Sequence, residues 1–465
     1  MQFIKRTLIN APADEVFRWH ARQGAMERLS PPWDRVELLE RKGGLEPGAL
    51  VKLRVHTGPV SMLWLAEHGA MQPGRMFSDH QLTGPFARWE HVHSFEPQGD
   101  HCVLEDRIDY ELPLGIIGRT LGRRFVRNKL ESAFAYRHAV TAADISTHLA
   151  VKGVKAMRIL ITGASGLVGR ELKNFLTAGG HEVKTLGRGK ADITWNVERS
   201  MLNASELEGF DAIVHLAGAN VGERWTRKHR AAIYDSRING TGLLCRALKQ
   251  LKRPPKVLVC ASAVGIYGNR GEESIDESSS HGGGFLASVC RAGEQACQPA
   301  VEAGVRVVNL RFGIILSPRG GALGKMLLPF KLGLGTNLGS GRQWMSWVSI
   351  DDAIGAVHHA IVSENLSGPV NVTAPNPVTN REFTKTMGKV LLRPVIWFLP
   401  WFATALPLKL IMGEMADEML LGGARVMPAK LLASGYKFRH ETLEAALRHV
   451  LGKRGQVAAP ALAKA

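Results

Sequence analysis

A glycine-rich turn between an apolar strand and a helix constrains this chain more than any other feature. The segment M-R-I-L-I-T-G-A-S-G-L-V-G-R-E-L begins at Met157 and places glycines at 163, 166 and 169. The first glycine permits a tight turn, the second lets backbone N–H groups approach a pyrophosphate, and the third lets the helix pack closely. Because the triplet stands in a strand–turn–helix context, it predicts a dinucleotide-binding loop. The predicted cofactor contacts in this loop are Gly163, Ser165, Gly166, Leu167, Val168 and Gly169.

The end of the next strand, H-E-V-K-T-L-G-R, indicates which dinucleotide fits. An acidic residue at this place would bind the ribose 2′-hydroxyl of NAD. No acidic residue stands between Glu182 and Asp192, whereas Arg188 offers a planar donor suited to a 2′-phosphate. We therefore expect NADP as the cofactor, with NAD as the weaker candidate. The alternative is that Arg188 is simply a solvated arginine at a strand end.

Strand-like and helical runs alternate after Met157, a pattern typical of a parallel α/β sheet. The strand-like runs are 157–162, 181–187, 211–217, 256–262 and 305–311. We expect a Rossmann-type NADP-binding domain over 157–378 and a helix-rich C-terminal lobe over 379–452. The low-complexity residues 453–465 predict a disordered tail.

Residues 1–150 follow a different pattern, that of an α+β domain. Strand-like segments separated by Gly/Pro turns come first, and an amphipathic helix over about 118–140 closes the region. We expect a helix-grip fold, in which an antiparallel sheet curves around one long helix and leaves a cavity for an apolar ligand. Residues 151–156 are the expected linker.

Charge and cysteine usage narrow the functional classes. The chain carries 59 Lys/Arg and 42 Asp/Glu residues, a net charge of +17. The basic residues are scattered and no nucleic-acid-binding motif accompanies them, so we do not expect nucleic acid as a partner. Five cysteines without C-x-x-C spacing argue against a disulfide framework and a zinc site, and they favour a reducing cytoplasm.

One apolar stretch, 395–413, has the length of a membrane span. It contains Pro400, Pro407 and Lys409, so we expect two short buried helices that break at the prolines and no stable membrane insertion. The first ten residues lack the continuous apolar core of a secretory signal.

Further motifs give the chain a family resemblance. They are I-T-G-A-S-G-L-V-G, V-H-L-A-G-A (214–219), R-W-T-R-K-H-R (224–230), S-R-I-N-G-T (236–241), A-S-A-V-G-I-Y-G (261–268), L-R-F-G-I-I-L (310–316), G-S-G-R-Q-W-M-S-W-V-S-I-D-D (339–352) and G-P-V-N-V-T-A-P-N-P-V-T-N (368–380). Through them, residues 157 to about 450 resemble the extended short-chain dehydrogenase/reductase superfamily, in its nucleoside-diphosphate-sugar epimerase-like branch. The resemblance implies an NADP-binding epimerase or oxidoreductase, with Leu216, Ala217 and Gly218 as further cofactor contacts.

The N-terminal region has a weaker resemblance of its own. It rests on the segment M-F-S-D-H-Q-L-T-G-P-F-A-R-W-E-H-V-H-S-F, which begins at Met76. Residues 1–150 resemble the START/polyketide-cyclase-like (SRPBCC) ligand-binding fold. The fold that this resemblance implies agrees with the helix-grip pattern.

The Tyr-x-x-x-Lys pair on which the chemistry of the parent superfamily depends is absent. None of the five tyrosines has a lysine four residues further on. In the superfamily this lysine lowers the pKa of the tyrosine, so that the tyrosine exchanges a proton near neutral pH. By the resemblance, the tyrosine place falls on Phe285 or Leu286, and the lysine place on Val289 or Cys290.

The remaining superfamily positions give the candidate catalytic residues. The Ser/Thr position falls on Ser262 or its neighbour Ala263, Tyr267 lies just beyond, and the asparagine position corresponds roughly to Arg237. Two alternatives stay open. Either Ser262, Tyr267 and Arg237, or Cys290, rebuild a reductase, epimerase or dehydratase site, or the chain is a non-catalytic NADP and ligand sensor.

Other polar residues have simpler interpretations. His91 and His93 alternate onto one strand face, as two metal ligands would, but no Cys or carboxylate cluster accompanies them in sequence. We therefore expect a polar strand face and no metal site. Asp352 precedes a helical run and fits its N-terminus, and Thr379-x-x-Glu382 predicts a capping box.

Overall fold

The structure is a computed structural model that describes residues 1–58, 60–151, 155–397 and 399–453. The chain divides into two compact units, an N-terminal unit up to residue 153 and a C-terminal unit that ends at Val450, with Thr177–Gly180 grouped with the first. This division falls in the predicted linker 151–156, of which residues 152–154 lie outside the described residues. The predicted tail 453–465 lies outside them too, except for Lys453.

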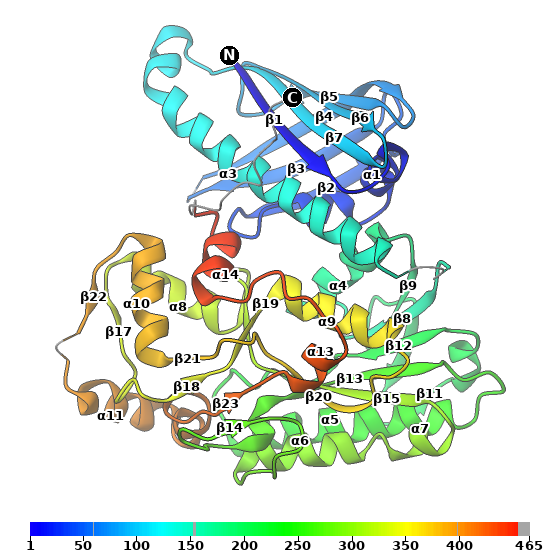
Figure 1. The fold of residues 1–465 in the computed structure, drawn as a ribbon, viewed down its shortest axis with the longest axis vertical. Coiled ribbons are helices and arrows are strands. Elements are labelled where there is room, and N and C mark those ends of the chain that lie inside the picture. The colour runs from blue at the N-terminus through cyan, green and yellow to red at the C-terminus, as the bar shows by residue number, and fades with distance from the viewer. Residues whose placement is uncertain (59, 152–154, 398, 454–465) are drawn as a thin grey trace. The chain divides into compact units, whose positions relative to one another are not determined.

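The N-terminal unit is an antiparallel sheet with one long helix. The strand order is β1-β7-β6-β5-β4-β3-β2. The strands are β1 Gln2–Ile9, β2 Val36–Lys42, β3 Leu50–Thr57, β4 Val60–Gln72, β5 Met76–Thr83, β6 Arg88–Gln98 and β7 His101–Glu111. Helices α1 (Ala13–Ala21) and α2 (Ala25–Leu29) follow β1, and α3 (Gly115–Leu149) lies along the sheet, as Figure 1 shows. This is the predicted helix-grip arrangement, which is confirmed.

Helix α3 is longer than the sequence predicts. It ends at Leu149 instead of near residue 140, because the extra turns still have interior positions to fill. Ile145 packs in the same core cluster as Trp19. Directly before it in the chain, the buried Asp144 accepts two hydrogen bonds from the buried guanidinium of Arg28, at 2.8 and 3.0 Å. A buried charge needs such a partner, so the pair ties α2 to α3.

The C-terminal unit is built on a sheet in the order β11-β10-β9-β8-β12-β13-β15-β20. The neighbours from β10 to β20 are parallel, and β11 pairs antiparallel. The strands are β8 Arg158–Thr162, β9 Glu182–Gly187, β10 Ile193–Asn196, β11 Met201–Leu202, β12 Ala212–His215, β13 Val257–Ala263, β15 Arg306–Phe312 and β20 Gly368–Val372. Every residue of β12 is buried, as expected for a parallel strand covered on both faces. The predicted Rossmann-type fold is confirmed.

Helices cover both faces of this sheet. Figure 1 shows α4 (Leu167–Ala178) and α9 (Ile350–Val362) on one face, and α5 (Arg227–Leu248), α6 (Phe285–Gln295) and α7 (Gln298–Glu302) on the other. The strand order reverses between β8 and β12, because β9 continues on one side and β13 on the other. In open α/β sheets, ligands bind at the carboxyl ends of the strands beside such a reversal.

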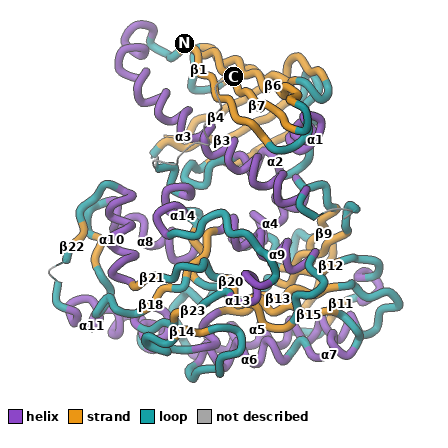
Figure 2. Tube along the Cα trace, viewed as in Figure 1, coloured by secondary structure: helices purple, strands orange, loops and turns teal. Residues whose placement is uncertain are grey.

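The remaining elements are short strands and helices, and Figure 2 shows helix and loop predominating among them. The paired strands are β14 (Ser274–Ile275) with β23 (Arg425–Val426), β16 (Ile314–Leu316) with β19 (Trp347–Ser349), β17 (Gly335–Thr336) with β22 (Val395–Ile396), and β18 (Trp344–Met345) with β21 (Val378–Thr379). The helices are α8 Gly321–Lys331, α10 Asn380–Leu391, α11 Trp401–Met412, α12 Glu414–Ala416, α13 Ala429–Ala433 and α14 Leu443–Val450.

Two predicted helix starts are confirmed. Helix α10 opens with a capping box, in which Thr379 Oγ1 accepts the Glu382 N–H at 3.3 Å and Glu382 Oε2 accepts the Thr379 N–H at 2.7 Å. At α9 the cap is Ser349, whose Oγ accepts the Asp352 N–H at 3.0 Å. Asp352 thus lies in the first turn, where a negative charge favours the positive end of the helix.

The expectation of two short buried helices in the apolar stretch 395–413 is wrong. A single helix, α11, begins after Pro400 and continues through Pro407. It is also largely uncovered: Trp401 is 63% exposed and Leu410 is 83% exposed. Apolar composition therefore did not imply burial here. Across the part of the chain that the structure describes, no helix has the length and apolar character needed to cross a membrane.

Candidate functional site

The glycine loop joins β8 to α4 beside the reversal of strand order. Gly163 has a φ of +69°, and a Cβ on it would lie 2.7 Å from the carbonyl carbon of Leu216. A Cβ on Gly169 would lie 2.3 Å from the carbonyl oxygen of Gly163, and one on Gly166 would lie 3.2 Å from the same atom. The first and third glycines are therefore required by close packing of backbone on backbone.

The loop keeps backbone donors at the protein surface. Ser165 and Gly166 are exposed, and α4 begins directly after them at Leu167 and Val168. The first N–H groups of a helix have no partner within the helix, and they carry its positive dipole end. This cradle fits the pyrophosphate of a dinucleotide.

Thr162 fixes the neighbouring strand end against the loop. Its Oγ1 accepts the N–H groups of Leu216 and Ala217, each at 3.1 Å, and lies 2.8 Å from Nδ1 of His215. Nε2 of His215 lies 3.1 Å from Oγ1 of Thr241. Burial, with a smaller contribution from Arg237, lowers the pKa of His215 to about 4. The imidazole is therefore neutral, and we assign Nδ1 as the acceptor of the Thr162 hydroxyl proton.

Arg237 lies on α5 against the loop that follows β12. A Cβ on Gly218 would come within 3.1 Å of the guanidinium, so a glycine is favoured there. Nη1 of Arg237 donates to the carbonyl oxygens of Ala219 at 3.0 Å and Ile233 at 3.3 Å. Burial lowers the pKa of Arg237, because few opposing charges surround it. The guanidinium of Arg237 therefore lies next to the loop that contains the predicted cofactor contacts Leu216, Ala217 and Gly218.

Ser262 stands at the carboxyl end of β13 and has a carboxylate partner. Its hydroxyl donates to Oε1 of Glu294, on α6, at 2.7 Å. Arg311 lies opposite Ser262 in the neighbouring strand β15 and holds the same carboxylate with two bonds, at 2.9 and 2.8 Å. A forked arginine–carboxylate pair of this kind fixes geometry as well as charge. Glu294 and Arg311 are the site residues that the sequence analysis missed.

Tyr267 bonds through its hydroxyl to residues other than Ser262. Its side chain is fully buried, its hydroxyl donates to Oδ1 of Asn371 at 2.8 Å, and it accepts from Nη1 of Arg311 at 2.8 Å. Burial raises the pKa of Tyr267, although Arg311 and the hydrogen bonds act in the opposite direction. Because both partners lie in the interior, the geometry gives Tyr267 the task of orienting Arg311.

Helix α6 shows what occupies the tyrosine and lysine places of the superfamily. Leu286 lies over Gly265, where an added Cβ would come within 3.3 Å of the leucine Cβ. The Cys290 thiol interacts with Ser262 and Arg237, and burial raises its pKa. Val289 is in the core, at 1% exposure. The pair on the Ser262 side is thus Leu286 and Cys290, and at an elevated pKa the thiol stays protonated near pH 7.

Arg188 follows β9 and is exposed. Among the described residues it has no recorded ion pair or side-chain hydrogen bond, so its guanidinium is free to meet a ligand. The nearest acidic residue that follows it, Asp192, is engaged elsewhere, because its Oδ2 accepts from the backbone N–H and the hydroxyl of Thr185 at 2.8 and 2.7 Å. Those bonds lower the pKa of Asp192 and keep its carboxylate on the side of β9.

The strand order and the glycine loop define an extended dinucleotide-binding fold, and comparisons with known proteins specify its class. A family model described as the NAD dependent epimerase/dehydratase family matches residues 159–372, and a domain of unknown function, DUF1731, matches residues 403–450. Residues 9–134 match a model described as polyketide cyclase/dehydrase and lipid transport.

Individual relatives agree with these matches. An epimerase family protein of Mycobacterium bovis is 41% identical over 302 residues, which is 64% of this chain and 98% of the relative. The crystal structure of a nucleoside-diphosphate sugar epimerase from Corynebacterium glutamicum has a TM-score of 0.80 at 31% identity, and the match covers 97% of this chain and 90% of that one. The human epimerase family protein SDR39U1, solved with NADPH, has a TM-score of 0.58 at 34% identity, over 63% of this chain and 99% of the human one. The chain belongs to the NAD-dependent epimerase/dehydratase family.

Proposed function

We propose that the C-terminal unit binds NADP(H) and acts on a small-molecule substrate as an epimerase-like or reductase-like enzyme. The observation that carries the proposal is the loop in which Gly163 and Gly169 have no room for a side chain. Arg188, exposed at the end of β9, favours the 2′-phosphate, and Oδ2 of Asp192, the acidic residue that follows, is already held by Thr185. The human relative solved with NADPH supports the same choice.

The proposed cofactor contacts follow the two strand ends. Gly163, Ser165, Gly166, Leu167, Val168 and Gly169 would hold the pyrophosphate, and Leu216, Ala217 and Gly218 would line the next strand end. Thr162 supports both groups, because it accepts from Leu216 and Ala217 and directly precedes Gly163.

Ser262 is the proposed proton-transfer residue. When bound, the nicotinamide would supply hydride transfer to or from a substrate carbon. Ser262 would accept the proton of a substrate hydroxyl as its own proton passes to Oε1 of Glu294, 2.7 Å away. Arg311 holds Glu294 in place for this step, and Arg237 contributes positive charge nearby. Tyr267, which the sequence also suggested, takes no step here, since its hydroxyl is bonded inside the core.

Cofactor titration tests the first half of this proposal. Fluorescence titration of the full-length protein should show tighter binding of NADPH than of NADH. Arg188→Ala should reduce this preference by roughly tenfold, as loss of one charge-assisted contact of about 1.5 kcal/mol implies. Lys190→Ala, two residues away and also exposed, is the matched control. Preference for NADH in the wild-type protein would reject the assignment.

Turnover tests the second half. Small molecules that co-purify with the protein can be identified by mass spectrometry and then added while NADPH absorbance is followed. Ser262→Ala and Glu294→Gln should each lower kcat by about 100-fold or more, the usual size of a proton-transfer contribution. Tyr267→Phe, which removes only a buried hydroxyl, should lower kcat far less.

A non-catalytic NADP sensor is the second candidate function. Leu286 and Cys290 at the two superfamily positions favour it, because neither can replace a phenolate activated by an ammonium group. Tight NADPH binding without turnover on any recovered compound, unaffected by Ser262→Ala, would support the sensor.

We also propose a ligand-binding role for the N-terminal unit and a cytoplasmic location. The polyketide cyclase and lipid transport match over residues 9–134 supports an apolar ligand there. All five cysteines are buried and unpaired, as expected in a reducing compartment. Extraction of the purified protein with organic solvent, followed by mass spectrometry, would identify a bound lipid-like molecule.

A further inference from the structure

Three polar side chains from two neighbouring strands meet inside the N-terminal unit. Asp79 of β5 stands directly opposite His91 of β6, and His93 shares the face of His91 because strand residues alternate. Oδ2 of Asp79 lies 3.2 Å from Nδ1 of His91 and 3.7 Å from Nε2 of His93. Each of the three residues offers one ligand atom within 4.8 Å of the other two.

This spacing matches that of ligands around a tetrahedral metal ion. Zinc–nitrogen and zinc–oxygen bonds of about 2.0–2.1 Å at tetrahedral angles place ligand atoms roughly 3.3 Å apart. The two distances from Oδ2 of Asp79, 3.2 and 3.7 Å, lie close to that value. Two histidines and one carboxylate are also a typical set for zinc or ferrous iron with positions left open.

The ring nitrogens of His91 and His93 that do not face Asp79 both lie close to the carboxylate of Asp106. Oδ1 of Asp106, on β7, lies 2.8 Å from Nε2 of His91 and 2.6 Å from Nδ1 of His93. The contact between Nε2 of His91 and Oδ1 of Asp106 is a hydrogen bond. Nδ1 of His93 is close to the same oxygen but lies outside hydrogen-bond geometry. A carboxylate behind a ligating histidine fixes the ring orientation and the tautomer.

Neighbouring groups hold this arrangement rigidly. Oδ2 of Asp106 lies 2.5 Å from Nε2 of His138, on α3, whose Nδ1 lies 2.8 Å from the Thr7 hydroxyl. The ring of Phe77 stacks on His93 at 4.1 Å between centroids. The histidines are thus oriented before any ligand arrives.

One edge of the cluster is partly exposed to solvent. The side chain of Asp79 is 19% exposed, whereas those of His91 and His93 are 4% and 10% exposed. The carboxylate is therefore the part of the cluster that solvent reaches first. A separate cavity of about 240 Å³ is lined by Ser78, Asp79, His80, Glu90, His91 and Val92, and most of these side chains lie on the sheet face opposite to Asp79 and His91, because strand residues alternate.

We propose that Asp79, His91 and His93 bind one divalent transition-metal ion, of the zinc and ferrous type, with Asp106 positioning both imidazoles. The cluster carries two carboxylates, and the cationic Arg137 lies near enough to interact with both. A bound ion would take the place of protons on the imidazoles, so binding releases protons and weakens on acidification. Magnesium and calcium are not expected, because they prefer all-oxygen sites.

Metal titration of the full-length protein tests this proposal. After chelator treatment and dialysis, Co²⁺ should bind at one ion per chain with visible absorption typical of four or five ligands, and Zn²⁺ should displace it. Asp79→Asn and His93→Gln should each weaken Zn²⁺ affinity by at least ~100-fold, the upper end of what loss of a supporting partner alone causes. X-ray absorption on the wild-type zinc complex should report two imidazole ligands.

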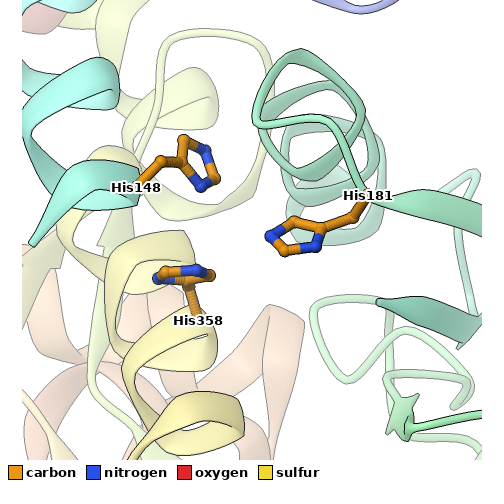
Figure 3. Close-up of side chains that lie close together, drawn as sticks. All are labelled: His148, His181 and His358. Atoms are coloured by element: carbon orange, nitrogen blue, oxygen red, sulfur yellow. The ribbon is translucent and has the colours of Figure 1, made fainter. Parts of the chain in front are cut away.

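Two matched variants separate this site from other histidines. His80→Gln removes a histidine next to Asp79 whose side chain lies on the opposite sheet face, and it should leave Zn²⁺ affinity unchanged. His358→Gln removes one of two neighbouring imidazoles in the C-terminal unit, His181 and His358, whose rings are 6.0 Å apart (Figure 3). It should also leave the affinity unchanged.

Three results would overturn the proposal. They are no ion bound by the wild-type protein, binding that survives both Asp79→Asn and His93→Gln, or binding lost in His358→Gln. Circular dichroism monitors folding of each variant. If His93→Gln does not fold, the isosteric Asp79→Asn, at the solvent-facing edge of the cluster, decides the question together with the wild-type absorption spectrum.

Discussion

Each unit has a buried polar network, and the two networks balance charge differently. In the C-terminal unit, one guanidinium, Arg311, neutralises one carboxylate, Glu294, and the neutral groups of Ser262, Tyr267 and Asn371 join this pair. A second carboxylate, Glu277, accepts the Asn371 backbone N–H at 2.9 Å. In the N-terminal unit, the two carboxylates of Asp79 and Asp106 face imidazoles, whose charge depends on protons or on a bound ion.

This difference separates a fixed framework from an adjustable site. An arginine stays charged at any ordinary pH, so the Glu294–Arg311 pair can orient Ser262 under all conditions. Imidazoles can exchange protons for a metal, so the Asp79–His91–His93 cluster can hold either protons or a metal ion while the fold of the N-terminal unit stays the same. Three substitutions test how far this contrast holds.

The largest expected effect follows removal of the fixed cation. Arg311→Met leaves the Glu294 carboxylate and the Tyr267 hydroxyl without their donor, in a place where Arg311 itself is 2% exposed. We expect a loss of about 3–5 kcal/mol in the free energy of unfolding of the C-terminal unit. Chemical denaturation followed by tryptophan fluorescence measures it.

The matched double variant Glu294→Gln/Arg311→Met removes both charges at once. It should recover part of that loss, because no unpaired buried charge remains. A single-variant loss of less than ~1 kcal/mol would mean that solvent already compensates Glu294, and that the framework is not fixed by this pair.

The next effect concerns His215, a buried imidazole bonded to Thr162 beside the glycine loop. His215 has a folded-state pKa of about 4 against an ordinary value of 6.5. The unfolded chain therefore binds a proton between these values while the folded chain does not, so stability is complete above pH 6.5 and declines as the pH falls toward 4. The shift corresponds to about 3 kcal/mol at roughly 1.4 kcal/mol per pH unit.

His215→Gln should make the free energy of unfolding of the C-terminal unit less dependent on pH over this window. Denaturation curves at several pH values, for both proteins, measure the difference in slope. Equal slopes would show that His215 is already protonated in the folded protein, contrary to the tautomer assigned with Thr162 and Thr241.

The smallest expected effect provides an exposed reference for the two buried networks. Thr379→Ala removes the capping box of α10, in which both hydrogen bonds are solvent-accessible. We expect a loss of about 1 kcal/mol. Lys385→Ala, exposed within the same helix, should change the free energy of unfolding by less than ~0.5 kcal/mol. A Thr379 effect as large as that of Arg311 would remove the distinction between buried and exposed networks.

Local patterns allowed the fold to be predicted. The spacing of Gly163, Gly166 and Gly169 between a strand and a helix, and the alternation of strands and helices, depend only on neighbouring residues. The extension of α3 to Leu149 and the exposure of α11 did not follow, because both depend on what the helices contact after folding.

The partners of the candidate residues depend on strand register. Glu294 lies 32 positions beyond Ser262, and Arg311 meets Ser262 only because β13 and β15 pair in parallel. One signal was present, since an arginine inside the apolar run of β15 requires a buried counter-charge. The alternation of His91 and His93 indicated two of the three proposed metal ligands. The third, the carboxylate of Asp79, comes from the neighbouring strand β5, where Asp79 pairs with His91.

The hydroxyl of Thr162 has a consequence for the speed of ligand capture. It joins the end of β8 to Leu216, Ala217 and His215 before any ligand is present. Little conformational entropy then remains to be lost when a dinucleotide docks, and no rearrangement has to precede the encounter. Association should therefore be a single-step process whose rate rises linearly with ligand concentration, and Thr162→Val should slow it by loosening both strand ends together.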